Sequence, residues 1–238
     1  MSNIYITGDT HRDYSSIAGF CECMQTTKDD LMIVLGDNGV NYYGNEDDLC
    51  LKAQLERLPI TFMFIRGNHD MRPTEKIGYQ TVWHDTDLWT GMFLVEPAFP
   101  SLLFAQDGHG YRLNGKIAFV IGGAYSVDKP FRLEYGLRWF PDEQLSKEDM
   151  WMIGHTLATW DKDVRPSVFL THTCPLRYKP IDALLPGVDQ STVDESMERW
   201  LDNIESLAPY ERWYCGHWHI DRTVDKLRFM YHDIILFE

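Results

Sequence analysis

The chain has 238 residues, 44% of them hydrophobic and 24% charged, which is the composition of an ordinary globular protein with a sizeable core. Its formal net charge of −14 disfavours a long nucleic-acid groove, because an acidic surface repels a polyphosphate backbone, although bound cations would also fit such an excess of acid. No apolar run reaches the roughly 20 residues of a membrane-spanning helix, and the N-terminus lacks the regions of a signal peptide, so we expect a cytoplasmic protein without a membrane partner.

The five cysteines show no spacing typical of disulfides, which favours reduced thiols and a cytoplasmic location. There is no internal repeat, low-complexity tract or linker in the sequence. We therefore expect a single domain over residues 1–238. The sequence does not indicate an oligomeric state.

The first part of the chain alternates short apolar runs with amphipathic segments. The apolar runs at residues 3–7, 31–35 and 61–65 predict buried strands. Between them, helical spacing predicts one helix from Tyr14 to Met24 and a second that starts at Asn45. This alternation favours βαβ units and a sheet covered by helices.

The rest of the chain has a more antiparallel pattern. Asn114-Gly115, between two apolar runs, predicts a hairpin. Residues 142–160 predict a helix with Ser146 and Asp149 as its capping box, and residues 191–207 predict another. Further strands are predicted at residues 167–170, 212–215 and twice within 227–237. The expected fold class is α/β with α+β character.

Polar clusters directly follow five of the predicted strands. They are Gly8-Asp9-Thr10-His11, Gly36-Asp37-Asn38, Arg66-Gly67-Asn68-His69-Asp70, Thr171-His172-Thr173 and Gly216-His217-Trp218-His219. Because ligands of open α/β sheets bind beyond the carboxyl ends of the strands, we expect the clusters to converge. Each cluster alone is also typical of a turn, a cap or a structural histidine. Their joint occurrence favours a site for divalent transition metals, which prefer carboxylate and imidazole ligands.

The ordered set Asp-x-His, Gly-Asp, Gly-Asn-His-Asp, His and Gly-His-x-His resembles that of the calcineurin-like metallophosphoesterases, in particular bacterial and phage-type members, and extends over residues 9–219. The resemblance implies two packed mixed β-sheets flanked by helices, a four-layer sandwich with a dinuclear metal site at the strand ends. It also implies a hydrolase that acts on a phosphate-ester substrate.

The resemblance implies roles for eight residues of these clusters. Asp9, His11 and His219 would hold one metal, Asn68, His172 and His217 the other, and Asp37 would bridge both, with His69 as the general acid. Manganese is the expected metal, and iron, zinc, cobalt or nickel suit the same ligand types. In such sites two ions about 3.5–4 Å apart clamp the attacking and leaving oxygens, and a bridging hydroxide is the expected nucleophile.

The chain departs from many relatives near His69. Protein phosphatases have an acidic residue three positions after the aspartate of Gly-Asp, where this chain has Val40. Asp70 could replace that acid, or it could face away as a supporting or capping group. The phosphate-binding arginine that follows the acid in protein phosphatases is also missing, which counts against a dedicated phosphoprotein phosphatase.

Four residues are candidate contacts for the substrate: Arg66, Tyr125, Lys129 and Arg132. Arg66 could clamp a phosphate or pair with an acid. The others lie in or beside the glycine-rich segment 122–129, which is similar to a segment of some bacterial and phage members and is either a pocket wall or a turn with solvated charges.

Substrate specificity is expected to lie in loops at residues 72–110 and 125–145. The aromatic residues of the first segment predict core and lid packing rather than a base-stacking platform, because lysine and arginine are not concentrated among them: Trp83, Trp89, Phe93, Phe99 and Phe104. In the last cluster, an extended backbone would direct His217 and His219 to the same side, with Trp218 packing behind them.

The expected activity is phosphomonoester hydrolysis on a small or exposed substrate. One alternative is a phosphodiesterase or nuclease acting on short nucleic acid or a cyclic nucleotide. The other is a non-catalytic, metal-bound regulatory scaffold, against which the complete ligand set speaks.

Overall fold

One hydrogen-bonded mixed sheet of 13 strands dominates the computed structural model, which describes residues 2–161, 164–184 and 186–238. The strands are β1 (Ile4–Thr7), β2 (Leu31–Val34), β3 (Thr61–Phe64), β4 (Gln80–Asp85), β5 (Trp89–Val95), β6 (Leu102–Phe104), β7 (Gly110–Leu113), β8 (Lys116–Ile121), β9 (Val168–Thr171), β10 (Arg212–Cys215), β11 (Arg222–Val224), β12 (Leu227–Phe229) and β13 (Ile235–Leu236). Their order is β11-β12-β10-β9-β8-β7-β5-β6-β3-β2-β1-β13, with β4 beside β5. The α-helices among the described residues are α1 (Ser15–Met24), α2 (Glu46–Arg57), α3 (Lys129–Glu134), α4 (Lys147–Ala158) and α5 (Ser196–Leu207).

The N-terminal half of the sheet consists of the parallel strands β1, β2, β3 and β6. Helices α1 and α2 cover its outer face, where Ile17 and Leu55 pack with Phe62 in one buried cluster. Helix α2 starts after Asn45, whose side-chain oxygen accepts a hydrogen bond from the Asp47 N–H at 3.0 Å. The predicted βαβ units and the start of this helix are confirmed.

The C-terminal half of the sheet has the parallel strands β8, β9 and β10 at its centre. The β7–β8 hairpin turns at Asn114 and Gly115, with positive φ angles of 47° and 78°, as predicted. Helix α4 has the predicted capping box of Ser146 and Asp149. Helix α5 begins at Ser196, later than predicted, because residues 190–192 form a separate 3-10 turn.

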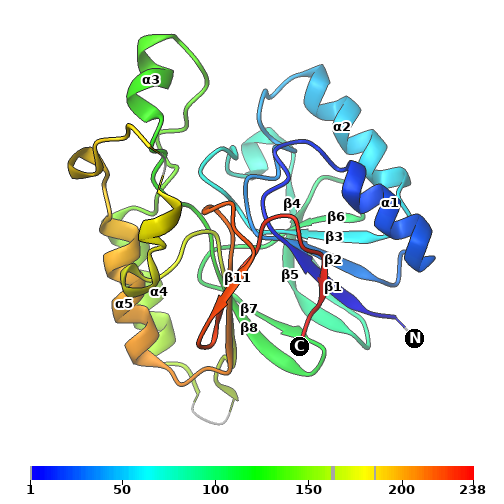
Figure 1. The fold of residues 1–238 in the computed structure, drawn as a ribbon. Coiled ribbons are helices and arrows are strands. Elements are labelled where there is room, and N and C mark those ends of the chain that lie inside the picture. The colour runs from blue at the N-terminus through cyan, green and yellow to red at the C-terminus, as the bar shows by residue number, and fades with distance from the viewer. Residues whose placement is uncertain (1, 162–163, 185) are drawn as a thin grey trace.

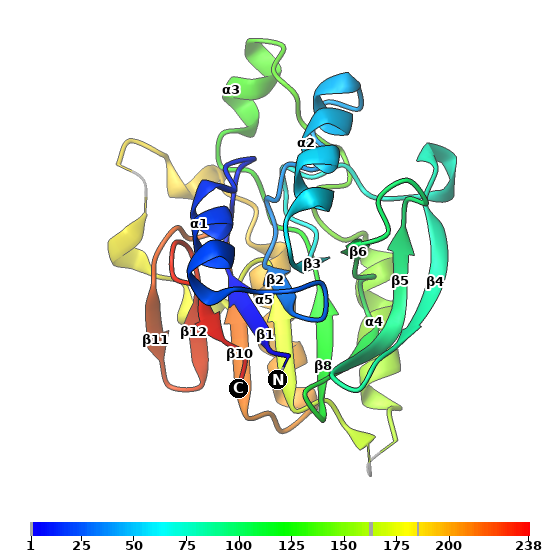
Figure 2. The same ribbon diagram turned by 90° about the vertical axis from the view of Figure 1, so that its right-hand side faces the viewer.

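Strand β5 joins the two halves into one curled sheet, because Val95 pairs with β6 while Trp89 pairs with β7. A buried cluster that includes Ile33 of β2 and Val120 of β8 lies between the halves. Figures 1 and 2 show α1 and α2 over one outer face and α4 and α5 over the other. The sequence predicted two separate packed sheets, whereas the structure has a continuous sheet that folds over its own core, as strand twist and coiling allow.

The segment that was expected to form a specificity loop at residues 72–110 contains three strands of this sheet, β4, β5 and β6. Its aromatic residues Trp89 and Phe93 are buried in the core, as predicted, but Trp83 on β4 is 61% exposed. Among the described strands, β4 pairs with β5 alone, so one of its edges is free of the sheet. The side chains of β4 are exposed or partly buried, because successive residues of a strand point to opposite faces and neither face of β4 is fully covered. Helix α3, in contrast, stands away from the layers in both views.

Candidate metal centre

The five polar clusters meet where β1, β2 and β3 of one half approach β9 and β10 of the other. The Asp9 carboxylate, after β1, accepts a hydrogen bond from the His217 N–H, after β10, at 3.0 Å. The carbonyl oxygen of Leu35, after β2, lies 2.8 Å from Nδ1 of His172, after β9. Parallel strands within each half end at the same edge, and these contacts bring the two edges together.

The first group of potential metal ligands contains Asp9, His11 and His219. Nε2 of His219 lies 3.2 Å from Asp9 Oδ2, and Nε2 of His11 lies 4.0 Å from the same oxygen. The two Nε2 atoms are 2.9 Å apart. The hydrogen bond that His219 donates to the Asp9 carboxylate raises the pKa of His219 above its ordinary value. Three donor atoms thus lie close enough to share one ion.

The second group contains Asp9, Asp37 and His172, with Asn68 next to it. Nε2 of His172 lies 3.5 Å from Asp37 Oδ1 and 2.8 Å from Asn68 Oδ1. The Asn68 amide is oriented by its Nδ2, which donates to Ser126 Oγ at 2.9 Å. Asp37 is buried and belongs to the second group, whereas Asp9 is the carboxylate that the two groups share.

The hydrogen bonds of His172 provide a direct test of whether a cation fits this site. Its Nδ1 faces the Leu35 carbonyl, an acceptor, so Nδ1 carries the hydrogen in the neutral ring. The lone pair of Nε2 then points at Asn68 Oδ1, which is also an acceptor. Two facing acceptors repel, and a metal ion accepts electron density from both. Donation from the second ring nitrogen to a carbonyl is the usual support of a metal-binding histidine.

The charge around Asp37 agrees with this arrangement. Burial alone would raise the pKa of Asp37, but His172, His69 and His11 hold it well below its ordinary value. Burial lowers the pKa of His217, whose ring centre is 5.0 Å from that of His172. The carboxylate form of Asp37 and the neutral form of His217 are the forms that bind metals.

Local backbone strain is concentrated at the same residues. His11, Asp37, His217 and His219 all have positive φ angles, of 44°, 41°, 69° and 50°. Such angles are uncommon for residues other than glycine and often mark functional sites. The glycine before Asp37 is required for space, since a Cβ at Gly36 would collide with the His172 ring.

The predicted extended conformation of the last cluster is therefore wrong, because β10 ends at Cys215 and the chain then turns, with the Trp218 N–H donating to the Gly216 carbonyl. The two imidazoles nevertheless have different neighbours: His219 lies with Asp9, and His217 lies with His172. Trp218 packs against the outer core of the C-terminal half.

His69 lies at the edge of these groups, and its N–H donates to Asp37 Oδ1 at 2.8 Å. Burial lowers the pKa of its imidazole, and the nearby Arg132, 3.4 Å from Nε2, acts in the same direction. Asp70 does not support this ring. Its carboxylate accepts hydrogen bonds from the N–H groups of Gly39 and Gly67 at 2.9 and 2.8 Å, so it faces away and holds the loops after β2 and β3.

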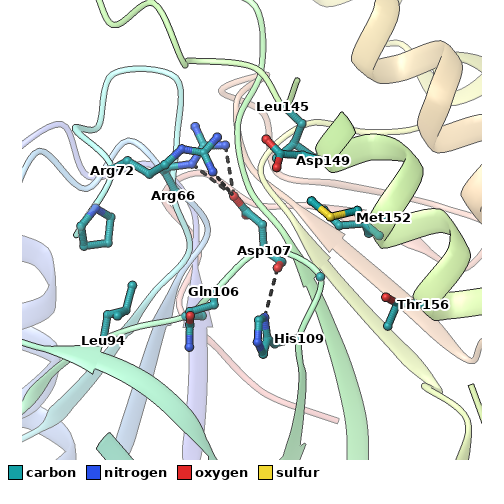
Figure 3. Close-up of a pocket in the computed structure, with 14 residues that line it drawn as sticks. Arg66, Arg72, Leu94, Gln106, Asp107, His109, Leu145, Asp149, Met152 and Thr156 are labelled. Carbon is teal, nitrogen blue, oxygen red and sulfur yellow. Dashed lines mark hydrogen bonds and ion pairs between the residues drawn. The ribbon is translucent and has the colours of Figure 1, made fainter. Parts of the chain in front are cut away.

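Arg66 lies away from the candidate metal centre and lines a separate cavity of about 390 Å³, here called the Arg66 cavity (Figure 3). Its guanidinium lies 3.3 Å from Asp107 Oδ2 and donates to the carbonyl oxygens of Gly122 and Glu143 at 3.2 and 3.0 Å. Arg72 reaches the same Asp107 oxygen at 3.3 Å. Of the two alternatives for Arg66, the structure shows the ion pair.

The other candidate substrate contacts divide into two kinds. Lys129 Nζ lies 4.3 Å from the ring centre of Trp139 and 5.5 Å from that of Tyr125, so its ammonium is held against aromatic faces. Arg132 pairs with Asp128 at 2.8 Å. Its guanidinium also lies 3.4 Å from Nε2 of His69, and none of the other three candidates has such a contact with His69 in the described part of the chain.

Sequence reasoning missed the residues that support the centre from outside the clusters. Ser126 orients Asn68, and Tyr231 stacks on His219 with ring centres 4.5 Å apart. Ser126 lies inside the glycine-rich segment that the sequence singled out, whereas a lone tyrosine near the C-terminus has no pattern that would indicate its role.

A cavity of about 510 Å³ opens over the metal centre. Its lining includes six of the polar residues discussed above: His11, Asp37, Asn68, His69, His217 and His219. A ligand in this cavity would therefore contact both groups of potential metal ligands at once.

Comparison with known proteins agrees with this geometry. Residues 2–221 match the family described as calcineurin-like phosphoesterase, so the chain belongs to this family, as the motifs predicted. Phosphoester hydrolysis is the family's activity, and the Asp and His groups are able to hold metals. None of the curated proteins matches the sequence.

Two of the solved structures that match the chain are compared with it as follows. One has a TM-score of 0.51 at 12% identity and covers 99% of this chain and 98% of its own. The protein TT1561 of Thermus thermophilus has a TM-score of 0.48 at 13% identity and covers 91% of this chain and 82% of its own. Within residues 2–161, 164–184 and 186–238, no helix is both long and apolar enough to cross a membrane.

Proposed function

We propose that the protein is a metal-dependent phosphomonoesterase acting on a small or exposed phosphate ester, with residues 1–238 working as one domain. The observation that carries the proposal is a pair of ligand groups that share Asp9 and reach, through His11, His219 and Asp37, a cavity of about 510 Å³. The continuous sheet supports a single working unit, because it supplies ligands from both halves.

The ligand assignment follows the two groups. Asp9, His11 and His219 would hold one divalent ion, Asn68, His172 and His217 the other, and Asp37 would contact both. Manganese is the proposed metal, and iron, zinc, cobalt and nickel suit the same donors. When bound, the two ions would supply a cationic clamp for phosphate and lower the pKa of water.

The charge of the site would favour an anion despite the acidic protein. Asp9 and Asp37 balance only part of the charge of two divalent ions, and the neutral histidines and Asn68 add none. The cavity floor would thus be positive, while the whole chain has a net charge of −14. This local charge suits a compact phosphate ester, whereas the surrounding surface disfavours a long polyanion.

His69 is proposed as the general acid for the leaving oxygen. It lines the cavity beside Asn68, and its main-chain N–H is fixed by Asp37. Its Nδ1 is buried and has no hydrogen-bond partner among the described residues, so the fold leaves the hydrogen-bonding capacity of this nitrogen unused.

The test is hydrolysis of nitrophenyl phosphate against bis-nitrophenyl phosphate, with manganese, by wild type and His69→Ala. We expect the monoester to be the better substrate of wild type. Preference for the bis-ester would favour a phosphodiesterase instead. No turnover of either ester, with both metals bound, would favour a regulatory scaffold and overturn the proposal.

A further inference from the structure

The cavity over the metal centre has a polar floor and an apolar wall. The floor is made of the candidate ligands and His69. The apolar residues of the wall are Val127, Ala183, Leu184, Val188, Trp218 and Ile220. Asp128 and Gln190 are its polar members, and no lysine or arginine is among the described lining residues.

Three separate segments of the chain supply this wall. Val127 precedes α3, Leu184 and Val188 follow the 3-10 turn Ile181–Ala183, and Ile220 follows β10. All four side chains are partly buried, so each still has apolar surface that faces the cavity. Such surface gains free energy when a ligand removes it from water.

We infer that the substrate of this phosphoesterase has a largely apolar organic group, alkyl or aromatic, which lies against this wall while its phosphate lies over the metal centre. This inference rests on the proposed function and adds the class of substrate to it. A sugar or polyol would place its hydroxyl groups against Val127, Leu184 and Val188, where their side chains offer no hydrogen-bond partner. An alkyl chain or an aromatic ring has no such cost there.

The size of the cavity agrees with this class of substrate. Its volume of about 510 Å³ is within the range of ordinary ligand pockets and exceeds what a phosphate alone would fill. Arg132 is ion-paired with Asp128 and Lys129 is held over Trp139, and neither is among the described residues that line the cavity. The wall therefore selects by apolar contact rather than by charge.

The first test compares ethyl phosphate with hexyl phosphate on the manganese-loaded wild type. Both are esters of primary alcohols, so their intrinsic reactivity is similar and a difference reports contact with the wall. Each methylene that leaves water contributes about fourfold, and we expect kcat/KM to be at least about tenfold higher for hexyl phosphate. Phenethyl phosphate, as the aromatic arm, shows whether the wall accepts rings as well as chains.

Variants of the wall connect this preference to the residues. Leu184→Ser and Val188→Ser should lower kcat/KM for hexyl phosphate about fivefold, and the ratio of hexyl phosphate to ethyl phosphate should fall. Ile181→Ser is the matched control, because Ile181 is 69% exposed on the same segment and is not among the residues that line the cavity. It should leave the ratio of the two esters unchanged.

A binding measurement separates this inference from the proposed function. Hexylphosphonate and ethylphosphonate cannot be hydrolysed at their P–C bond, and calorimetry should show tighter binding of hexylphosphonate. Equal kcat/KM for the two esters, or a preference for glucose 6-phosphate, would overturn the inference and leave the phosphoesterase intact. Tighter binding of hexylphosphonate without hydrolysis of any ester would overturn the proposed activity and retain the apolar wall.

Discussion

Two cavities of this protein lie beside buried polar side chains, and they differ in whether those side chains have hydrogen-bond partners within the fold. Around Arg66, the guanidinium contacts Asp107 and main-chain carbonyls, so its charge has partners within the fold. Over the metal centre, His172 Nε2 faces Asn68 Oδ1, acceptor against acceptor. A satisfied charge cluster supports the fold, whereas an arrangement of facing acceptors is suited to a cation that the chain does not supply.

The largest expected effect comes from Asp37→Asn, which removes the charge of the proposed bridging ligand. We expect kcat/KM to fall by more than about a hundredfold, since even changes to residues behind metal ligands cost up to that much. Metal content, measured on the same protein by elemental analysis, should fall as well. Unchanged metal content and activity would show that the metal centre is assigned to the wrong residues.

His69→Ala tests the chemistry of the centre without removing a proposed ligand. We expect hydrolysis of an alkyl phosphate to slow by about a hundredfold, the usual contribution of a general acid. Nitrophenyl phosphate should be affected less, because nitrophenolate leaves without needing a proton. Equal losses for both esters would argue against His69 as the acid, and metal content serves as the control.

Substitutions in the Arg66 cavity should lower the stability of the protein rather than its activity. Arg66→Met leaves Asp107 with one fewer partner, and we expect the free energy of unfolding to fall by about 3 kcal/mol, as measured in urea. Arg72→Met, at the more exposed member of the cluster, is the control and should cost less. The kcat/KM of the folded Arg66→Met protein should stay within about threefold of wild type. A hundredfold loss would instead support Arg66 as a contact for the substrate.

The smallest effect is expected from Ser126→Ala, which removes the partner of the Asn68 amide. Asn68 would then be free to rotate its oxygen away from His172, and metal affinity should fall about tenfold. Ser15→Ala, at an exposed serine in the first turn of α1, is the matched control. Equal manganese affinity in both variants would show that Ser126 does not orient the ligand.

Much of the fold and of the ligand set could be predicted because local patterns encode them. The apolar run before Asp9 and the helix that starts after Asn45 depend on neighbours in sequence, and both are as expected. The curling of the sheet through β5 depends on pairings between distant strands, which no local pattern specifies. The resemblance to the family implied two packed sheets, and the structure has one curled sheet.

The parts of the site that could not be predicted depend on tertiary contacts. His217 and His219 leave the extended region because the chain turns at the end of β10. Asp70 and Arg66 were each compatible with two roles, since a sequence does not show which side chain meets which partner. Burial among main-chain N–H groups and carbonyls places both in supporting positions.

The most direct test of the account is the number of manganese ions bound per chain, measured by equilibrium dialysis on wild type, His219→Ala and His172→Ala. The two histidines belong to different ligand groups, so each substitution should affect one ion. The account predicts two ions in wild type and one in each variant. Identical stoichiometry in all three proteins would contradict it.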